Sequence, residues 1–152
     1  KIVSICKKSG IKRYITLNVV GYDHGSDQMR RIIDASVDCG ISAVIASDLS
    51  VINYASSKGI GVHLSTQLNI TNIESLKFYS QWADVAVLAR ELNLDQVGYI
   101  YNTIREQDIR GPKGDLVRLE MFAHGALCMA ISGKCYLSLH ENNKSANRKH
   151  SL

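Results

Sequence analysis

Residues 43–65 read AVIASDLSVINYASSKGIGVHLS, and this stretch decides the fold. Two short apolar runs, Ala43 to Ala46 and Val62 to Ser65, flank a helical segment from Leu49 to Lys58 that stops at Gly59. Each run is hydrophobic at odd and even positions alike rather than at alternate ones, which is typical of strands buried on both faces of a parallel sheet. The stretch therefore predicts a strand–helix–strand unit with two parallel strands.

The same pattern continues on both sides of this unit. Further strands are predicted at Tyr14 to Val19, Val85 to Ala89 and Val117 to Phe122. Further helices are predicted over Asp27 to Cys39, from the capping-box spacing of Thr71-Asn-Ile-Glu74, and from Leu94 to about Arg105 with Asn93 as the cap. The expected order is one helix, then four strand–helix pairs, then a fifth strand. Such alternation implies right-handed crossovers and a parallel sheet.

Polar residues follow the carboxyl end of every predicted strand, which favours a barrel over a doubly wound sheet. A barrel collects groups from all its strands at one mouth, whereas a doubly wound sheet uses a few strands at its switch point. The strand-end residues are Asn18, Ser47, Asp48, Ser65, Thr66, Gln67, Arg90, Glu91 and His124.

The predicted fold class is therefore α/β, a partial TIM-barrel-like (β/α) fragment with about five parallel strands. A complete eight-stranded barrel takes about 250 residues, and this chain has 152. Residues 1–140 are interpreted as the barrel fragment and residues 141–152 as an exposed tail.

Composition places the chain among ordinary globular proteins, with 45% hydrophobic and 21% charged residues. No window reaches the roughly 18 apolar residues of a membrane span, and Lys1 to Gly10 lack the features of a signal peptide. These observations predict a cytoplasmic protein without a membrane partner. The net charge of +4 permits contact with RNA but does not argue for it, because basic clusters are usually solvated surface.

Four cysteines are present, and a chain of this size needs no disulfide framework. Cys128 and Cys135 stand seven positions apart around Gly133, so both thiolates can reach one metal or cluster. They form only half a site, because iron–sulfur clusters and structural zinc take four ligands. Buried core thiols, or a redox or nucleophilic role, remain alternatives for the pair. Cys6 and Cys39 are interpreted as packing residues on helices.

Other candidate site residues each allow two interpretations. Arg90 and Glu91 follow an apolar strand, either as a functional pair that binds an anion or as a structural salt bridge. His124 and Cys128 have the helical spacing of an activated thiolate, a weak signal for a cysteine hydrolase.

Ser65, Thr66 and Gln67 offer neutral hydrogen bonds that suit a base or a small acid, although a strand-end turn uses the same residue types. His63 is interpreted as a satisfied core or outer-face residue.

Residues 120–138, EMFAHGALCMAISGKCYLS, resemble the signature of the peptidase U32 (collagenase-like) family. The match runs Glu, one gap, Phe, two gaps, Gly-Ala-Leu-Cys, four gaps, Gly, one gap, Cys, one gap, Leu-Ser. The resemblance extends through residues 14–18, 43–48, 63–67 and 87–91, so it covers nearly the entire chain.

This resemblance implies a TIM-barrel-like catalytic domain, first catalogued as a collagenase-like peptidase. Other members look like oxygen-independent hydroxylation enzymes that carry a four-iron four-sulfur cluster. These act on tRNA wobble uridine with prephenate as co-substrate, on ribosomal RNA cytidine, or on ubiquinone precursors. Cys128 and Cys135 match the first two cluster cysteines. Ser145-Ala-Asn-Arg148 also matches, but Lys149 to Leu152 departs and no later cysteine follows. The signature residues of this chain therefore cannot complete a four-cysteine cluster.

The leading hypothesis is a fragment of an iron–sulfur-dependent tRNA hydroxylation enzyme. In it Cys128 and Cys135 bind the cluster, and the substrate mouth is lined by Gln67, Arg90, Glu91 and His124. The alternatives are a collagenase-like peptidase and an inactive structural arc that forms a homo-oligomer through its exposed sheet edges.

Overall fold

The computed structural model describes residues 2–125 together with residues 130 and 140. The strands are β1 (Tyr14–Leu17), β2 (Ala43–Ala46), β3 (Gly61–Leu64), β4 (Val85–Val87) and β5 (Arg118–Glu120). The helices are α1 (Ile2–Lys8), α2 (Ser26–Asp38), α3 (Leu49–Ser57), α4 (Ile73–Ser80) and α5 (Leu94–Glu106), with short 3-10 turns η1 (Asp23–Gly25) and η2 (Thr66–Leu68). The expected tail, residues 141–152, lies outside the described residues.

All five strands form one parallel sheet in the order β1-β2-β3-β4-β5. Every strand therefore pairs with its neighbour in sequence, and the order of the strands across the described sheet never reverses. A doubly wound sheet requires such a reversal at its switch point. The expected α/β class with five parallel strands is confirmed, and the arrangement is compatible with an arc of a β/α barrel.

The predicted elements differ from the observed ones mainly at their ends. β2 has the predicted bounds, whereas the run Val85 to Ala89 pairs only as far as Val87. The cap expected at Thr71 is instead Asn72, whose side chain accepts a hydrogen bond of 2.9 Å from the backbone N–H of Ser75. The capping box that precedes α5 is present and joins Asn93 to Gln96.

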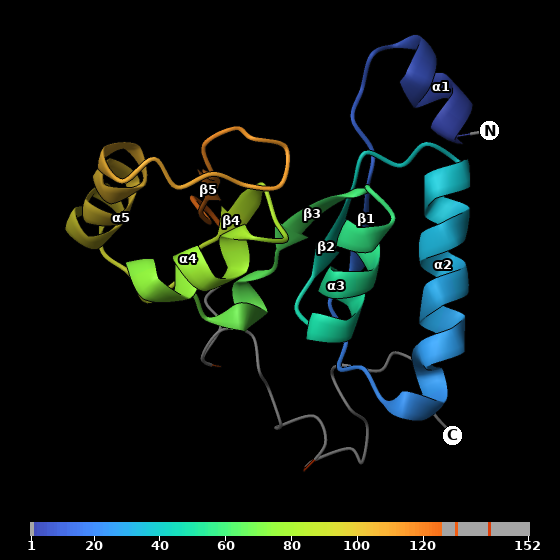
Figure 1. The fold of residues 1–152 in the computed structure, drawn as a ribbon, viewed down its shortest axis with the longest axis horizontal. Coiled ribbons are helices and arrows are strands. Elements are labelled where there is room, and N and C mark those ends of the chain that lie inside the picture. The colour runs from blue at the N-terminus through green and yellow to red at the C-terminus, as the bar shows by residue number, and fades with distance from the viewer. Residues whose placement is uncertain (1, 126–129, 131–139, 141–152) are drawn as a thin grey trace.

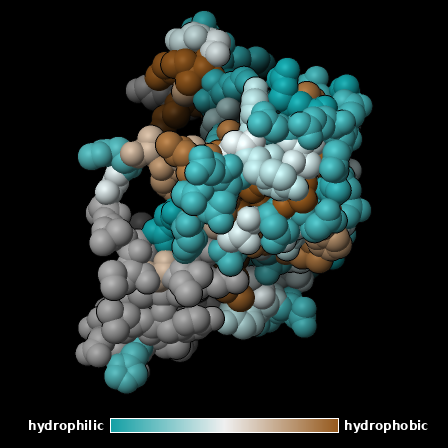
Figure 2. Space-filling view, turned by 90° about the vertical axis from the view of Figure 1, so that its left-hand side faces the viewer, coloured by the Kyte–Doolittle hydropathy of each residue, from teal (hydrophilic) through white to brown (hydrophobic). Residues whose placement is uncertain are grey.

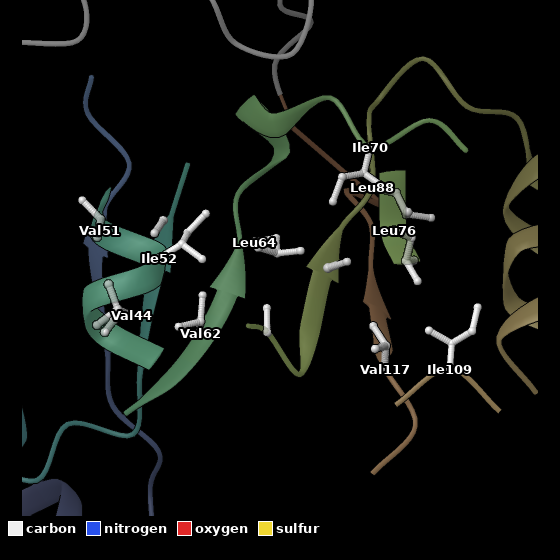
Figure 3. Packing of buried hydrophobic residues seen from close by; sticks show 14 of the residues in the cluster. Val44, Val51, Ile52, Val62, Leu64, Ile70, Leu76, Leu88, Ile109 and Val117 are labelled. Carbon is white, nitrogen blue, oxygen red and sulfur yellow. The ribbon is translucent and has the colours of Figure 1, made fainter. Parts of the chain in front are cut away.

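The hydrophobic core lies between the sheet and its helices. Figure 1 shows α3 and α4 in front of the strands, with α2 and α5 on the two flanks. Figure 3 shows the buried side chains that fill this layer; those labelled on β2, β3 and α3 are Val44, Val62, Leu64, Val51 and Ile52. Burial of each such side chain stabilises the fold by about 1.5 to 3 kcal/mol. The strands are thus fixed from one face.

Not every large apolar side chain on the helices is buried. Ile33 on α2 is fully buried, but Val37, four residues further along the same helix, is 39% exposed, and Phe78 on α4 is 53% exposed. The Phe78 ring instead packs edge-on against the Tyr79 and Trp82 rings.

The first helix stands apart from this core. None of the residues of α1 is buried, and Ile2 and Ile5 are more than half exposed. Figure 2 shows hydrophobic side chains gathered at the upper end of the molecule, where Figure 1 places α1, whereas the centre of that face is mostly hydrophilic. Among the described helices, none is long and apolar enough to cross a membrane.

Candidate functional site

The carboxyl ends of the first three strands bring predicted site residues together. The hydroxyl oxygen of Ser47 lies 3.1 Å from the backbone oxygen of Asn18 and 3.1 Å from Oε1 of Gln67. The single hydroxyl proton can serve only one of these acceptors at a time. The sequence-predicted residue Gln67 therefore belongs to a neutral, hydrogen-bonding surface built from three successive strand ends.

Thr66 extends this surface toward the fourth strand. Its hydroxyl donates a hydrogen bond of 3.3 Å to the backbone oxygen of Leu88, just past β4. The preceding residue, Ser65, is buried and caps the turn η2 by accepting from the backbone N–H of Gln67. The structure confirms the strand-end turn, and the binding of a base or a small acid by the same residues stays a prediction.

Asp48, at the end of β2, joins two neighbouring loops. Its carboxylate accepts hydrogen bonds of 2.9 Å from the backbone N–H groups of Gly21 and Ser50, and it caps α3. A Cβ atom on Gly21 would lie only 2.8 Å from the Asp48 carboxylate, so a larger residue there would displace that carboxylate from its hydrogen bond with the Gly21 backbone. Burial raises the pKa of Asp48, but the bonds from Ser50 and Gly21 outweigh it, and the pKa falls below its usual value.

Replacing Asp48 by alanine is expected to destabilise the full-length protein by about 1 kcal/mol, because both loops lose their shared acceptor. The stabilisation by this lowered-pKa carboxylate is present above the unfolded-state pKa and is lost as the pH falls through the lower folded-state pKa. Urea unfolding between pH 3 and 7 measures both effects, because this range includes the pH of about 4 at which an ordinary aspartate titrates. Asp48→Asn is the control, since it can still cap the helix but cannot titrate. An equal acid dependence in wild type and Asp48→Asn would contradict the prediction.

Arg90 reaches from the fourth strand end into the signature segment. Its Nη2 donates a hydrogen bond of 2.7 Å to the backbone oxygen of Ala130. Its Nε is buried and has no hydrogen-bond partner in the described part of the chain. Glu91, beside it, is exposed. The guanidinium therefore holds a backbone carbonyl that lies between Cys128 and Cys135 in sequence.

The fifth strand leads to the remaining predicted residues. His124 is exposed beyond the end of β5. Cys128 and Cys135 lie outside the described residues, so the proposed His124–Cys128 contact and the cysteine pair stay predictions. Within residues 2–125, 130 and 140, no three His, Cys, Asp or Glu residues gather in a way that could hold a metal ion.

The other two cysteines precede β1 and β2, near the amino ends of the strands and opposite the carboxyl ends described above. Cys6 is on α1 and is half-buried, and Cys39 is exposed just after α2. Gly40, the next residue, accepts a hydrogen bond from Arg13, which immediately precedes β1. The prediction that Cys39 is a packing residue is wrong, because the last turn of α2 faces solvent.

A cavity of about 420 Å³ lies beside the carboxyl end of β1. Its walls come from the β1–α2 loop and the first turns of α2 and α3, and include Leu17, Val19, Tyr22, His24, Met29 and Val51. Most of these side chains are apolar. Sequence reasoning missed the cavity, because the loop carries no recognisable motif.

Sequence reasoning also missed a pair formed by His63 and Glu120. His63 Nδ1 lies 3.5 Å from Glu120 Oε1, and the Tyr14 ring centroid is 4.8 Å from that of His63. Burial, the largest influence, lowers the pKa of His63, while the nearby Glu120 carboxylate raises it in part. Of the two expected positions for His63, core or outer face, the structure shows a buried one. A usable signal existed, since Glu120 opens the signature segment and His63 opens one of the matching upstream stretches.

Comparison with known proteins gives a consistent family match. The family profile described as peptidase family U32 matches residues 1–150. A collagenase from Porphyromonas gingivalis (strain W83) is 62% identical over 148 residues, which cover 97% of this chain and 36% of that protein.

Relatives with RNA-modification names are more distant. A 23S rRNA 5-hydroxycytidine synthase of Escherichia coli is 34% identical over 97% of this chain and 21% of its own length. A protein of the same organism named tRNA hydroxylation protein P is 32% identical over 91% of this chain and 29% of its own length. The chain thus spans about a third or less of the length of these relatives.

Proposed function

The chain belongs to peptidase family U32, and on that premise we propose that its parent protein hydroxylates a base of tRNA. The observation that carries the proposal is the neutral hydrogen-bonding surface at the strand ends, where Ser47 joins Asn18 and Gln67. RNA-modifying enzymes read an unstacked base by hydrogen bonds to its edge, and amide and hydroxyl groups suit that task. Wobble uridine, a single-stranded base, is the proposed target.

Arg90, Glu91 and His124 are proposed to line the same mouth. Arg90 follows Leu88, whose backbone oxygen accepts a hydrogen bond from Thr66, and a guanidinium matches the geometry of an RNA phosphate. His124 is exposed on the segment that leaves β5. The names of two relatives, tRNA hydroxylation protein P and the rRNA 5-hydroxycytidine synthase, support this class of substrate. Prephenate is proposed as co-substrate.

Cys128 and Cys135 are proposed as two ligands of a four-iron four-sulfur cluster, which transfers single electrons when bound. The donor set fits in part, because two thiolates supply half of the usual four ligands. Cys6 and Cys39 lie near the amino ends of the strands. Glu120, in contrast, is at the carboxyl end of β5, on the segment of sequence that continues to Cys128. We infer that the remaining ligands come from residues of the parent protein beyond these 152.

The proposal is tested by complementation. A strain that lacks the parent gene is complemented with the full-length gene, and the nucleosides of its purified tRNA are measured by mass spectrometry. Restoration of a hydroxylated wobble uridine is the expected result. Unchanged nucleosides in the deleted and complemented strains would reject tRNA as the substrate.

A collagenase-like peptidase is the second candidate, because two Porphyromonas gingivalis relatives at 62% and 51% identity are named collagenase. Purified full-length protein would then cleave denatured collagen, with the products followed by mass spectrometry. Cleavage that survives Cys128→Ser but is abolished by a chelator would favour a metal peptidase.

A self-associating arc is the third candidate. In the described sheet, β1 and β5 each pair with one strand only, so each presents an open edge that can pair with another copy. Concentration-dependent dimerisation of the 152-residue chain, measured by sedimentation, is the result expected of such an arc. A monomer at all concentrations would reject it.

Replacing Arg90 by glutamine is expected to loosen the peptide that contains Ala130. A hydrogen bond to a charged group contributes about 1.5 to 3 kcal/mol, which corresponds to roughly 10- to 150-fold faster amide exchange on its loss. Hydrogen exchange of the full-length protein, read by mass spectrometry, measures the effect. Arg105→Gln on α5 is the matched control, since its guanidinium packs over the exposed Tyr101 ring. Equal exchange in both variants would show that Arg90 does not hold the segment.

A further inference from the structure

The face of the sheet that turns away from the helices carries a polar centre. Val62 and Leu64 on β3 point into the helix-side core, so His63 between them projects to the opposite face. Tyr14 on β1 reaches the same point, because the residue paired with it on β2 is the small Ala43. On β5, Glu120 approaches the imidazole from the other side.

We propose that His63 is the proton-accepting residue of the parent protein's active site and that Glu120 is its positioning residue. With Nδ1–H directed at the Glu120 carboxylate, the neutral imidazole presents the lone pair of Nε2. A proton from an N–H or O–H group of the bound ligand moves to Nε2, and the imidazolium that results is paired with the carboxylate. Only the proton changes place in this step, so it needs no oxidant or reductant. A base held and oriented by a carboxylate is a recurrent arrangement in enzymes.

The exposures of the two side chains suit these roles. The His63 side chain is 8% exposed, whereas that of Glu120 is 51% exposed. Burial disfavours the charged form of an imidazole, whereas the exposed Glu120 carboxylate can turn toward it from the solvent side. The separation of 3.5 Å is longer than an ideal hydrogen bond, and such catalytic contacts often tighten only when the ligand binds.

Charges of both signs surround His63. Glu120 and Asp84 favour the protonated imidazole, and Arg118 and Lys113 oppose it. Tyr14 covers one side of the ring. Burial then decides the outcome, and the pKa of His63 lies below its usual value, so the imidazole is neutral and able to accept a proton at neutral pH.

The position of His63 places it beneath the proposed mouth. Ser65, two residues further along the chain, begins the strand-end turn, and two residues of extended strand span about 7 Å. Active sites of parallel β/α barrels lie at the carboxyl ends of their strands. A planar base held at Gln67 and Ser47 would therefore project toward His63. The inference rests on the proposed function for the identity of this ligand.

The first arm of the test needs no substrate. Full-length protein is treated with diethyl pyrocarbonate, which reacts with neutral, accessible imidazoles, and the modified peptides are found by mass spectrometry. We expect His63 to react, but more slowly than the exposed His24 and His124, because only a small part of its imidazole is open to a reagent. If His24 and His124 react and His63 does not, the imidazole is enclosed by packing and the inference is overturned, whatever the protein acts on.

The second arm measures function and separates catalysis from packing. His63→Gln is expected to lower the hydroxylated nucleoside in complemented cells about 100-fold or more, the usual contribution of a general base, without loss of bound iron. In vitro, the acidic limb of the pH–rate profile is expected to move to lower pH in Glu120→Gln, because the carboxylate that raises the His63 pKa is gone. Glu74→Gln, which removes an exposed partner of Lys77, is the control and leaves the profile unchanged.

Two results separate the inference from the proposed function. If wild type forms the nucleoside and His63→Gln does so within about threefold, the proton-acceptor role is overturned and the RNA proposal stands. If wild type forms none, the RNA proposal fails by itself, and the reaction of His63 with diethyl pyrocarbonate still decides whether this imidazole is available to a ligand.

Discussion

Replacing Cys128 and Cys135 together by serine is expected to remove all iron and acid-labile sulfide from the anaerobically purified full-length protein. A cluster of this type contains four irons, so roughly four irons per chain should fall to near none. The visible absorption of the cluster should disappear with them. Serine preserves the size of each side chain but does not supply the thiolate that binds iron. The measurement combines iron and sulfide analysis with the absorption spectrum.

Cys6→Ser, Cys39→Ser is the matched control, because it also removes two thiols. Both residues belong to the amino edge of the sheet, away from the strand ends that form the proposed mouth. This control should keep the iron of wild type. Equal loss of iron in both double variants would indicate general damage rather than loss of ligands. If wild-type protein contains no iron, the cluster proposal is rejected. Cys128 and Cys135 are then interpreted as core thiols or redox thiols.

The second large effect concerns the core. Leu64→Ala is expected to destabilise the full-length protein by about 2 to 5 kcal/mol, the range for a leucine truncated in a packed interior. Leu64 is 1% exposed and, in the view of Figure 3, lies between Ile52 of α3 and Leu88 beyond β4. Truncation would leave a cavity on β3, the strand that carries His63. The backbone that positions the His63 side chain would then be less firmly packed. Urea unfolding monitored by circular dichroism measures the shift.

Leu94→Ala is the control for this prediction, since Leu94 is 74% exposed at the start of α5. The same atoms are removed, but little surface is uncovered, so the change should stay within about 0.5 kcal/mol. Similar losses in both variants would mean that Leu64 is not in a tightly packed layer.

Much of the fold could be predicted from the sequence because buried parallel strands have a local signal, a short continuous run of apolar residues. The run Ala43 to Ala46 is apolar on both faces, and its bounds match β2. Strand ends are harder, since pairing depends on the neighbour: Val85 to Ala89 is uniformly apolar, yet pairing with β5 stops at Val87. Phe78 fits the helical period but is exposed, because periodicity does not tell which part of a helix face the sheet can cover.

The candidate site was predictable only where it depends on strand ends. Gln67 and Ser47 meet because the carboxyl ends of parallel strands share one edge. His63 and Glu120 come from β3 and β5, so their approach depends on the strand order and on how side chains lean across β4. Asp48 lies at the end of β2 as expected and also caps α3, since a carboxylate that follows a strand is equally suited to begin a helix.

The strictly sequential order of the strands also bears on how the chain folds. Each strand pairs with the one that precedes it, so every pairing in the described sheet closes after a single intervening helix. Contacts that are close in sequence form quickly, because little loop entropy is lost before they stabilise the structure. A nascent chain can therefore add one strand and one helix at a time as it leaves the ribosome, each docking on the unit before it.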